Sequence, residues 1–239
     1  MGEKRVGRKA LQMIRLHIVA EGQTEEGFVN NVLKQHLAQF DVFADVRCIE
    51  TSRRRWNRQI FRGGFLSYEM LKNDLLLWMK QDTHPEVRFT TMVDVYALPS
   101  DFPGFEAIGM AKDPISLIAR LESLMAEDID SSRLIPYLQL HEFEALLLAE
   151  PSHLSTFFIE HDQAIRRLTE MAQSYASPEL INQGKQTAPS KRIIAEIPEY
   201  EYQKTSVGPA IAEKIGLPVL RQKCPHFDKW VTLLETLKS

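Results

Sequence analysis

Residues Leu16-His-Ile-Val-Ala-Glu-Gly-Gln-Thr-Glu25 change character halfway along their length. The apolar run that ends at Ala20 is typical of a buried strand, and the segment that begins near Glu25 has the apolar spacing of a helix. Gly22 permits a tight turn between the two, and Thr24 is in position to cap the helix. A strand, a turn and a helix in this order predict the start of a parallel α/β sheet.

The alternation of strand and helix continues through the first 150 residues. Apolar runs predict strands, and apolar residues three and four apart predict helices. The expected strands cover residues 42–49, 88–94 and 134–140, and the expected helices cover residues 68–79 and 115–125. With the first strand, this order predicts an α/β fold, a mostly parallel four-stranded sheet flanked by helices on both faces.

The C-terminal part of the chain has a different pattern. Helices are expected over residues 154–171, 191–196 and 209–215, and a last helix face comprises Phe227, Trp230, Val231, Leu234 and Leu237. We therefore expect an α/β domain over residues 13–150 and a helical C-terminal part over residues 151–239 packed on it. Residues 1–12 are expected to form a flexible basic tail.

Composition argues against several classes of protein. The chain of 239 residues has a net charge of −3 and a pI near 6.2, so nucleic-acid contact would need a local basic patch. The sequence has no signal-peptide pattern, no apolar run of about 18 residues and no P-loop, which predicts a cytoplasmic protein without membrane contact or its own ATPase site. Cys48 and Cys224 are expected to be reduced, and Cys224-Pro-His226 provides only half of a zinc site.

Acidic residues follow three of the expected strands. Glu21, Asp94 and Glu142 each stand where an apolar run ends, and the carboxyl ends of neighbouring parallel strands meet at one edge of a sheet, where ligands bind. Carboxylates suit Mg²⁺ and Mn²⁺, which can activate water for phosphodiester cleavage. We therefore predict that these acids bind Mg²⁺ or Mn²⁺ and act catalytically. The alternative is a set of turns with solvated acids.

Glu144 is a further candidate ligand, and its role depends on local structure. In a strand, Glu142 and Glu144 would share a face, whereas on a helix they would point about 200° apart and could not serve one ion together. A helix that begins near His141 would place one acid at its positive N-terminal end. His141 is either a general base or ligand, or a hydrogen-bonded structural residue.

Basic residues provide the candidate nucleic-acid contacts. An arginine-rich loop around Trp56 and Phe61 could follow a phosphate backbone while an aromatic ring stacks on an unpaired base. Its arginines are Arg53, Arg54, Arg55, Arg58 and Arg62. Lys204 is another expected contact, and Lys191 is a candidate for neutralising a phosphate oxygen during cleavage. Simple solvation is the alternative for each of them.

Several motifs together resemble a known family. The motifs are Val19-Ala-Glu-Gly-Gln-Thr-Glu25, Val93-Asp-Val-Tyr-Ala-Leu-Pro99 with Asp101-Phe-Pro-Gly104, and His141-Glu-Phe-Glu-Ala-Leu-Leu147. They resemble an uncharacterised bacterial family of Toprim-like proteins, related to the Toprim domains of overcoming-lysogenization-defect nucleases. The resemblance spans nearly the whole chain, because it includes Arg62-Gly-Gly64, Ala188-Pro-Ser-Lys-Arg192 and Cys224-Pro-His-Phe227.

The resemblance implies roles for individual acids. A Toprim glutamate after the first strand serves acid-base chemistry and metal binding, which corresponds to Glu21, and an Asp-x-Asp after the third strand binds magnesium. Here that motif reads Asp94-Val-Tyr96, so another acid would have to complete a two-ion site. The expected metal ligands are Glu21, Asp94, Asp101, Glu142 and Glu144, and the expected catalytic residues are Glu21, Asp94, Glu142 and Lys191.

The implied activity is Mg²⁺- or Mn²⁺-dependent cleavage of DNA or RNA, with an ATPase partner protein in a phage-defence setting. A homo-oligomer is left open. One rival interpretation is a non-catalytic partner that binds nucleic acid or an ATPase through the same fold. Another is a phosphoacceptor receiver, which would need paired acids after the first strand, whereas this chain has a lone Glu21 there.

Overall fold

The computed structural model describes residues 13–49, 67–110, 113–181 and 184–238. In this part of the chain the sheet has the strand order β2-β1-β3-β4, with β5 also paired to β3, and every pairing is parallel. The strands are β1 (Ile14–Ala20), β2 (Val42–Cys48), β3 (Val87–Asp94), β4 (Leu134–Ile135) and β5 (Leu138–Gln139). The predicted α/β class and its mostly parallel sheet are confirmed.

The first helix is continuous but changes its winding. It runs as α1 (Gln23–Phe28), a π-helical turn (Val29–Leu33) and α2 (Lys34–Ala38). The other α-helices are α3 (Tyr68–Gln81), α4 (Pro114–Ile129), α5 (Glu144–Leu147), α6 (Asp162–Gln173), α7 (Pro189–Glu196), α8 (Tyr200–Ile215), α9 (Leu217–Lys223) and α10 (Pro225–Glu235). Short 3₁₀ turns cover Val95–Ala97, Phe105–Ala107, Pro151–Thr156, Pro178–Leu180 and Lys185–Thr187.

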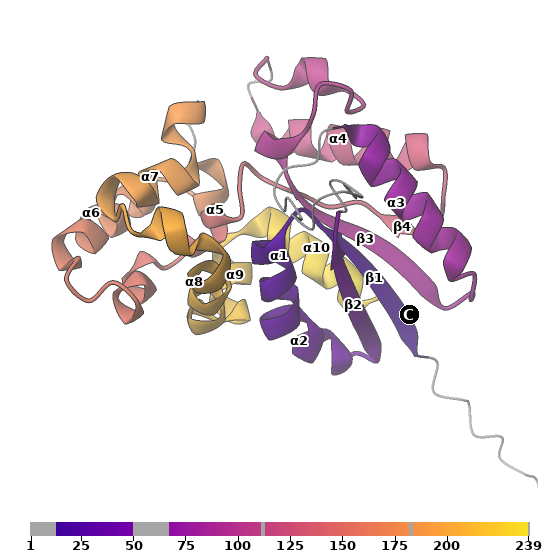
Figure 1. Cartoon of the computed structure of the whole chain (residues 1–239), viewed down its shortest axis with the longest axis horizontal. Helices are drawn as coiled ribbons and strands as arrows, with labels where there is room; N and C mark the ends of the chain where they lie inside the picture. The colour runs from indigo at the N-terminus through magenta and orange to yellow at the C-terminus, as the bar shows by residue number, and fades with distance from the viewer. Residues whose placement is uncertain (1–12, 50–66, 111–112, 182–183, 239) are drawn as a thin grey trace, which may run out of the picture.

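Helices cover both faces of the sheet. Alternate residues of each strand point to opposite faces, so each strand contributes side chains to two cores. Leu16 and Ile18 of β1 pack in the core that contains Phe28 and the C-terminal helices. Val19, on the other face, packs in the core formed with α3 and α4. Figure 1 shows this division, with α3 and α4 on one side of the sheet and α1, α2 and α10 on the other.

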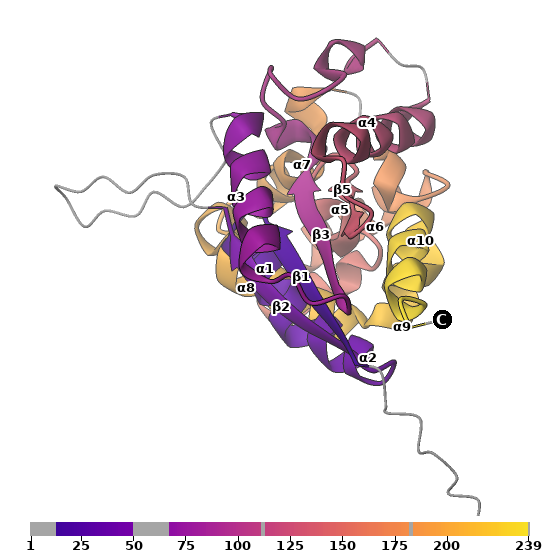
Figure 2. The same ribbon diagram turned by 90° about the vertical axis from the view of Figure 1, so that its right-hand side faces the viewer.

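The helical C-terminal part shares a core with the sheet. Tyr137, which lies between β4 and β5, stacks on Trp230 of α10 with ring centroids 4.1 Å apart. The indole N–H of Trp230 donates to Thr90 Oγ1 of β3 at 2.9 Å, and Figure 2 shows α10 running alongside the sheet. C-terminal helices are thus present as predicted, while the division into two parts at residue 150 stays a prediction.

Two local predictions for the first 150 residues are wrong. The segment expected to form one strand over residues 134–140 is split into β4 and β5, because the N–H of Tyr137 donates to the hydroxyl of Thr91 instead of to a backbone carbonyl oxygen of β3. Thr24 does not cap the first helix, which begins at Gln23. Glu25 serves its start instead, since its Oε2 accepts the N–H of Gly22 at 2.9 Å.

Two of the predicted segments lie outside the described residues. These are the basic tail over residues 1–12 and the arginine-rich loop with Arg53, Arg54, Arg55, Arg58 and Arg62.

Candidate functional site

Acidic side chains meet at the carboxyl ends of three strands. β3 is hydrogen-bonded to β1 on one side and to β5 on the other, so Asp94, the last residue of β3, lies centrally. Glu21 follows β1, and its Oε2 accepts the N–H of Asp94 at 2.9 Å. Asp94 Oδ2 in turn accepts the N–H of Phe143 at 3.1 Å. The predicted convergence of Glu21, Asp94 and the segment around Glu142 is therefore present.

Helices add two more carboxylates to this edge. Glu25 of α1 and Glu144 of α5 are 5% and 6% exposed, values that are unusual for carboxylates. The helical C-terminal part closes over them, since the hydroxyl of Tyr200 lies 3.3 Å and Lys204 Nζ lies 3.5 Å from Glu144 Oε1. We call Glu21, Glu25, Asp94, Glu142 and Glu144 the acid cluster.

Glu142 and Glu144 have different surroundings, because α5 begins at Glu144. Glu142 precedes the helix, and its Oε2 accepts the N–H of Ser190 at 2.9 Å. The turn that places it depends on His141, which adopts a left-handed φ of 65°, a conformation that costs free energy for a residue other than glycine. The helical alternative for this pair is therefore the one that occurs.

Glu21, Glu25, Asp94 and Glu144 hold their protons more tightly than ordinary carboxyls do. Burial, and secondarily the charges of Glu144 and Glu142, raise the pKa of Glu21 to about 7. Burial and the charge of Glu21 raise the pKa of Glu25 to about 8. Burial also raises the pKa of Asp94 well above its usual range and raises that of Glu144. Like charges crowded in a buried place are costly, and functional sites often contain them.

Positive charge in the cluster is scarce. Within the described parts of the chain, Lys204 is the one basic side chain that forms an ion pair with a member of the acid cluster. Asp94 Oδ1 is buried and accepts no hydrogen bond from any residue that the structure describes. A bare carboxylate oxygen in such a position favours a proton or a cation.

The donor chemistry of the cluster suits a hard divalent ion, because carboxylate oxygens are the preferred ligands of Mg²⁺ and Mn²⁺. The side chains are not already arranged around an ion: no three His, Cys, Asp or Glu side chains of the described residues form a group that could hold one. Four carboxylates each direct an oxygen to a backbone N–H instead. Binding would therefore require these side chains to rotate.

Three other predicted site residues have distinct positions. Asp101 is exposed, and both of its carboxylate oxygens accept the N–H of Tyr68 at 2.9 and 3.0 Å. It caps α3, whose first N–H groups have no partner within the helix, and it is not part of the acid cluster. Lys191 is exposed on α7, directly after Ser190. Lys204, expected to contact nucleic acid, faces Glu144 instead of projecting freely into solvent.

Glu25 is the site residue that sequence reasoning missed. It lies one helical turn after Glu21, and this spacing could have suggested that both side chains reach the same place. Its position in the first turn of a helix gave it another explanation, as an acid favoured by the helix dipole. In the structure Glu25 lies in the first turn of α1, and its carboxyl is also buried near the charge of Glu21.

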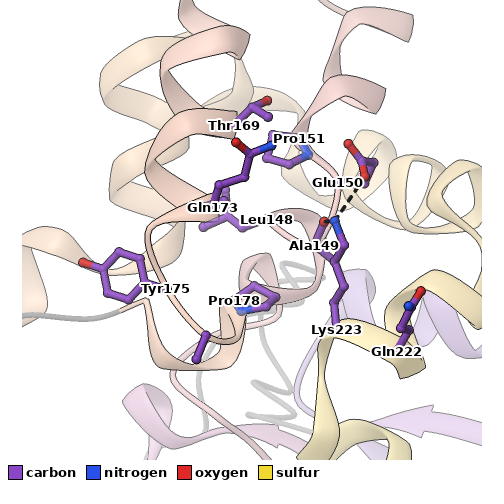
Figure 3. A pocket seen from close by; sticks show the side chains of 12 residues that line it. Leu148, Ala149, Glu150, Pro151, Thr169, Gln173, Tyr175, Pro178, Gln222 and Lys223 are labelled. Carbon is purple, nitrogen blue, oxygen red and sulfur yellow. Dashed lines mark hydrogen bonds and ion pairs between the residues drawn. The ribbon is translucent and has the colours of Figure 1, made fainter.

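Two cavities lie near these elements. One of about 530 Å³ is bounded by Val95, Tyr96, Leu140 and His141, the residues beside Asp94 and Glu142. Another of about 300 Å³ lies in the helical C-terminal part, where Figure 3 shows the ion pair between Lys223 and Glu150 beside it. No member of the acid cluster lines this second cavity. Only the first is placed to serve the cluster.

Cys224 and His226, weighed above as half of a zinc site, belong to the core of the protein. His226 Nε2 lies 3.1 Å from the carbonyl oxygen of Leu138 and 3.1 Å from Glu122 Oε1. The two N–H groups at the start of α10, those of His226 and Phe227, donate to the carboxylate of Glu179. These contacts explain the motif as a helix start.

The comparisons with known proteins give one match. The model of a family described as a domain of unknown function, DUF4276, matches residues 20–235. Neither the comparison with curated proteins nor that with solved structures found a match. Within the described residues, no helix has both the length and the apolar character needed to cross a membrane.

Proposed function

Because the chain belongs to DUF4276, a family defined as a domain of unknown function, we propose its function from the site itself: it is a Mg²⁺- or Mn²⁺-dependent nuclease. The acid cluster would hold the metal, and the reaction would be hydrolysis of a phosphodiester in DNA or RNA. The observation that carries this proposal is Asp94 Oδ1, a buried carboxylate oxygen that has no hydrogen-bond partner among the described residues, in a carboxylate that Glu21, Glu25 and Glu144 surround with like charge.

Electrostatics supports a cation at this place. Burial, and to a lesser extent the charges of neighbouring acids, raise the pKa values of Glu21 and Glu25, so additional negative charge is disfavoured here when no cation is present. A phosphate could approach such a site only if positive charge intervened. A bound divalent ion would supply that charge and would activate a water molecule for attack on phosphorus.

The residues of the chain would then divide the remaining work. Asp94 and Glu21 would be the principal ligands, and Glu142 or Glu144 would complete the oxygen shell. Glu21, whose pKa of about 7 lies near neutrality, is suited to accept or return a proton at its free oxygen. Lys204 is positioned to balance charge at Glu144, and Lys191 remains a candidate for contact with a phosphate oxygen.

The finer features of the proposal rest on the Toprim resemblance of the motifs. They comprise a Toprim-type mechanism, an ATPase partner protein and a phage-defence setting. The arginine-rich loop would position the nucleic-acid backbone and supply the phosphate contacts that the acid cluster cannot make.

The first test neutralises the carboxylate of Glu21. Wild-type protein, Glu21→Gln and the control Glu69→Gln are incubated with plasmid, single-stranded DNA and tRNA across a range of Mg²⁺ and Mn²⁺ concentrations. Glu69 is exposed on α3 and lies outside the acid cluster. We expect metal-dependent cleavage by the wild type and the control, and at least a hundredfold loss in Glu21→Gln, about the size of a general acid-base contribution.

A non-catalytic binding role is the second candidate. It is favoured by the engagement of Glu21 and Asp94 with backbone N–H groups, which gives both acids a structural role. This role predicts nucleic-acid binding that survives in Glu21→Gln, and no cleavage by any variant. Equal cleavage by wild type and Glu21→Gln would contradict the nuclease proposal at its centre.

A further inference from the structure

The cavity of about 530 Å³ beside the acid cluster continues directly from the two strands that carry the acids. Val95 and Tyr96 of its wall follow Asp94 in the chain, and Leu140 and His141 precede Glu142. The N–H of Tyr96 donates to the carbonyl oxygen of His141 at 3.1 Å and joins the two wall segments. A group in this cavity would therefore lie next to whatever the acid cluster binds.

The wall of the cavity has a uniform chemistry. Its remaining described side chains come from α4 and from the segment before it, and they are apolar: Leu98, Phe105, Ile108, Pro114, Leu117, Ile118 and Leu121. No Asp, Glu, Lys or Arg is among the lining residues that the structure describes. The suitable occupant is thus an uncharged group, in contrast to the highly charged site beside it.

Two rings form the part of the wall nearest the acids. The rings of Tyr96 and His141 are in contact, with centroids 5.3 Å apart and planes inclined by 37°. Aromatic rings and neighbouring aliphatic side chains bind flat, uncharged rings well, and nucleobases are the flat rings that accompany phosphodiesters. In a nucleotide, a single sugar separates the base from its phosphate. This short separation is compatible with a base in the cavity and a phosphate at the acid cluster, because the cavity wall begins one residue after Asp94.

We propose that this cavity binds the base of the nucleotide next to the phosphate on which the acid cluster acts. The proposal rests on the nuclease function proposed above and specifies its substrate. A base in a duplex is stacked and paired, so it cannot enter a pocket without being extruded. The preferred substrate is therefore an unpaired strand or a loop. Entry of its base into the cavity selects it before cleavage takes place.

The binding step can be tested without metal and without cleavage. Saturation-transfer NMR is recorded on the full chain with adenosine, uridine and ribose, in the presence of a chelator. Ribose lacks the base and reports contact with the sugar alone. Two variants on α4 form a matched pair, because Leu117 lines the cavity whereas Ile115 is exposed, with 42% of its surface accessible. Leu117→Trp would fill the cavity, and Ile115→Trp would not.

We expect saturation of the base protons of both nucleosides in wild type and Ile115→Trp, and none with ribose. Binding should weaken at least fivefold in Leu117→Trp, about the size expected for the loss of base stacking. If Leu117→Trp melts at a lower temperature than Ile115→Trp, it is replaced by Ile108→Trp, which fills the cavity from the segment before α4. Absence of base saturation in the wild type, or equal binding by the filled and control variants, would overturn the proposal.

A second experiment distinguishes the binding of a base within a strand from the binding of a free nucleoside. A short single-stranded oligonucleotide and the same sequence in a duplex compete with adenosine for the cavity. We expect displacement by the single strand and none by the duplex; displacement by both, or by neither, would contradict the proposed substrate. The nuclease function fails on a different result, which is cleavage that is insensitive to Glu21→Gln, so the two failures are distinguishable.

Discussion

Asp94 unites the site at the scale of single residues. Its N–H donates to Glu21, one of its carboxylate oxygens accepts the N–H of Phe143, and its other oxygen is buried and has no hydrogen-bond partner in the described part of the chain. Three separate strand ends are thus joined through one residue. Since a buried acceptor without a partner costs about 1–3 kcal/mol, we infer that this arrangement is maintained for a bound cation.

The raised pKa values predict that stability depends on pH. In the folded protein Glu21 keeps its proton up to a pKa of about 7 and Glu25 up to about 8, whereas both titrate near 4.5 when the chain is unfolded. Between these values the native state binds more protons, so the free energy of unfolding falls as the pH rises. At about 1.4 kcal/mol per unit of pKa shift, the loss of the proton from Glu21 alone lowers the free energy of unfolding by roughly 3 kcal/mol.

Thermal melting of metal-free protein between pH 5 and pH 8.5 measures this effect. We expect the melting temperature to fall as the pH rises, and Glu21→Gln to melt with a flatter dependence because it has no proton to lose. Glu25, Asp94 and Glu144 also have raised pKa values, so part of the slope will persist in that variant. Identical slopes in both proteins would show that Glu21 titrates normally.

The position of Glu21, Asp94 and Glu142 could be predicted from the sequence, because an acid that ends an apolar run stands at a strand terminus. The function of Asp101 could not, since nothing in the residues around it shows that the start of α3 lies nearby. Lys204 pairs with Glu144, which lies sixty positions earlier in the sequence. Such pairings are determined by the packing of helices that local patterns do not specify.

At the scale of elements, side-chain hydroxyls of β3 bind the residues on either side of Pro136, which lies between β4 and β5. Thr90 Oγ1 donates to the carbonyl oxygen of Ile135 at 2.6 Å. Thr91 Oγ1 donates to the carbonyl oxygen of Tyr137 at 2.8 Å and accepts the N–H of Tyr137 at 3.0 Å. These hydroxyls take the place of ladder hydrogen bonds and keep β5 attached where Asp94 and Glu142 must meet.

Thr91→Val should therefore destabilise the fold. Valine has a similar shape but no hydroxyl, so a buried N–H and a buried carbonyl oxygen of Tyr137 lose their partner, at a cost of about 2–4 kcal/mol in the free energy of unfolding. Urea denaturation of Thr91→Val and of Thr91→Ser measures this cost. Serine keeps the hydroxyl and should lose much less; a Thr91→Val protein as stable as Thr91→Ser, or more stable, would show that these hydrogen bonds do not stabilise the fold.

Most elements were predictable because their periodicity is strong, as in β1 and α3. The division of the segment over residues 134–140 depends on two threonines of another strand, which no pattern within the segment reveals. The helix predicted over residues 209–215 is only the second half of α8, which begins at Tyr200. Pro209 suggested a helix start, as proline favours the first turn, but here it lies inside the helix.

At the scale of the whole molecule, α8 of the helical C-terminal part is pressed against α1. A Cβ added at Gly27 of α1 would lie 2.8 Å from Pro209 Cγ of α8, and one added at Gly208 of α8 would lie 3.3 Å from Thr24 Cγ2 of α1. This close approach brings Tyr200 and Lys204 to Glu144. Sequence patterns indicate the helices but not this contact.

Gly27→Ala should thus destabilise the protein, although alanine is the better helix former by about 1 kcal/mol. Overpacking against Pro209 costs about 1–3 kcal/mol, which outweighs that gain. A double-mutant cycle with Pro209→Ala provides the control, since removal of Cγ should relieve the clash and recover part of the loss. Additive effects on the free energy of unfolding would show that the two residues do not interact.

Binding of Mn²⁺ followed by electron paramagnetic resonance at pH 8 tests the central claim most directly, with wild-type protein compared with Asp94→Asn. We predict a saturable site in the wild type, weakened more than about tenfold in the variant, since even changes next to metal ligands weaken binding by that much. Mn²⁺ binding that is equal in both proteins, or that does not saturate in the wild type, would contradict a metal site built on the acid cluster.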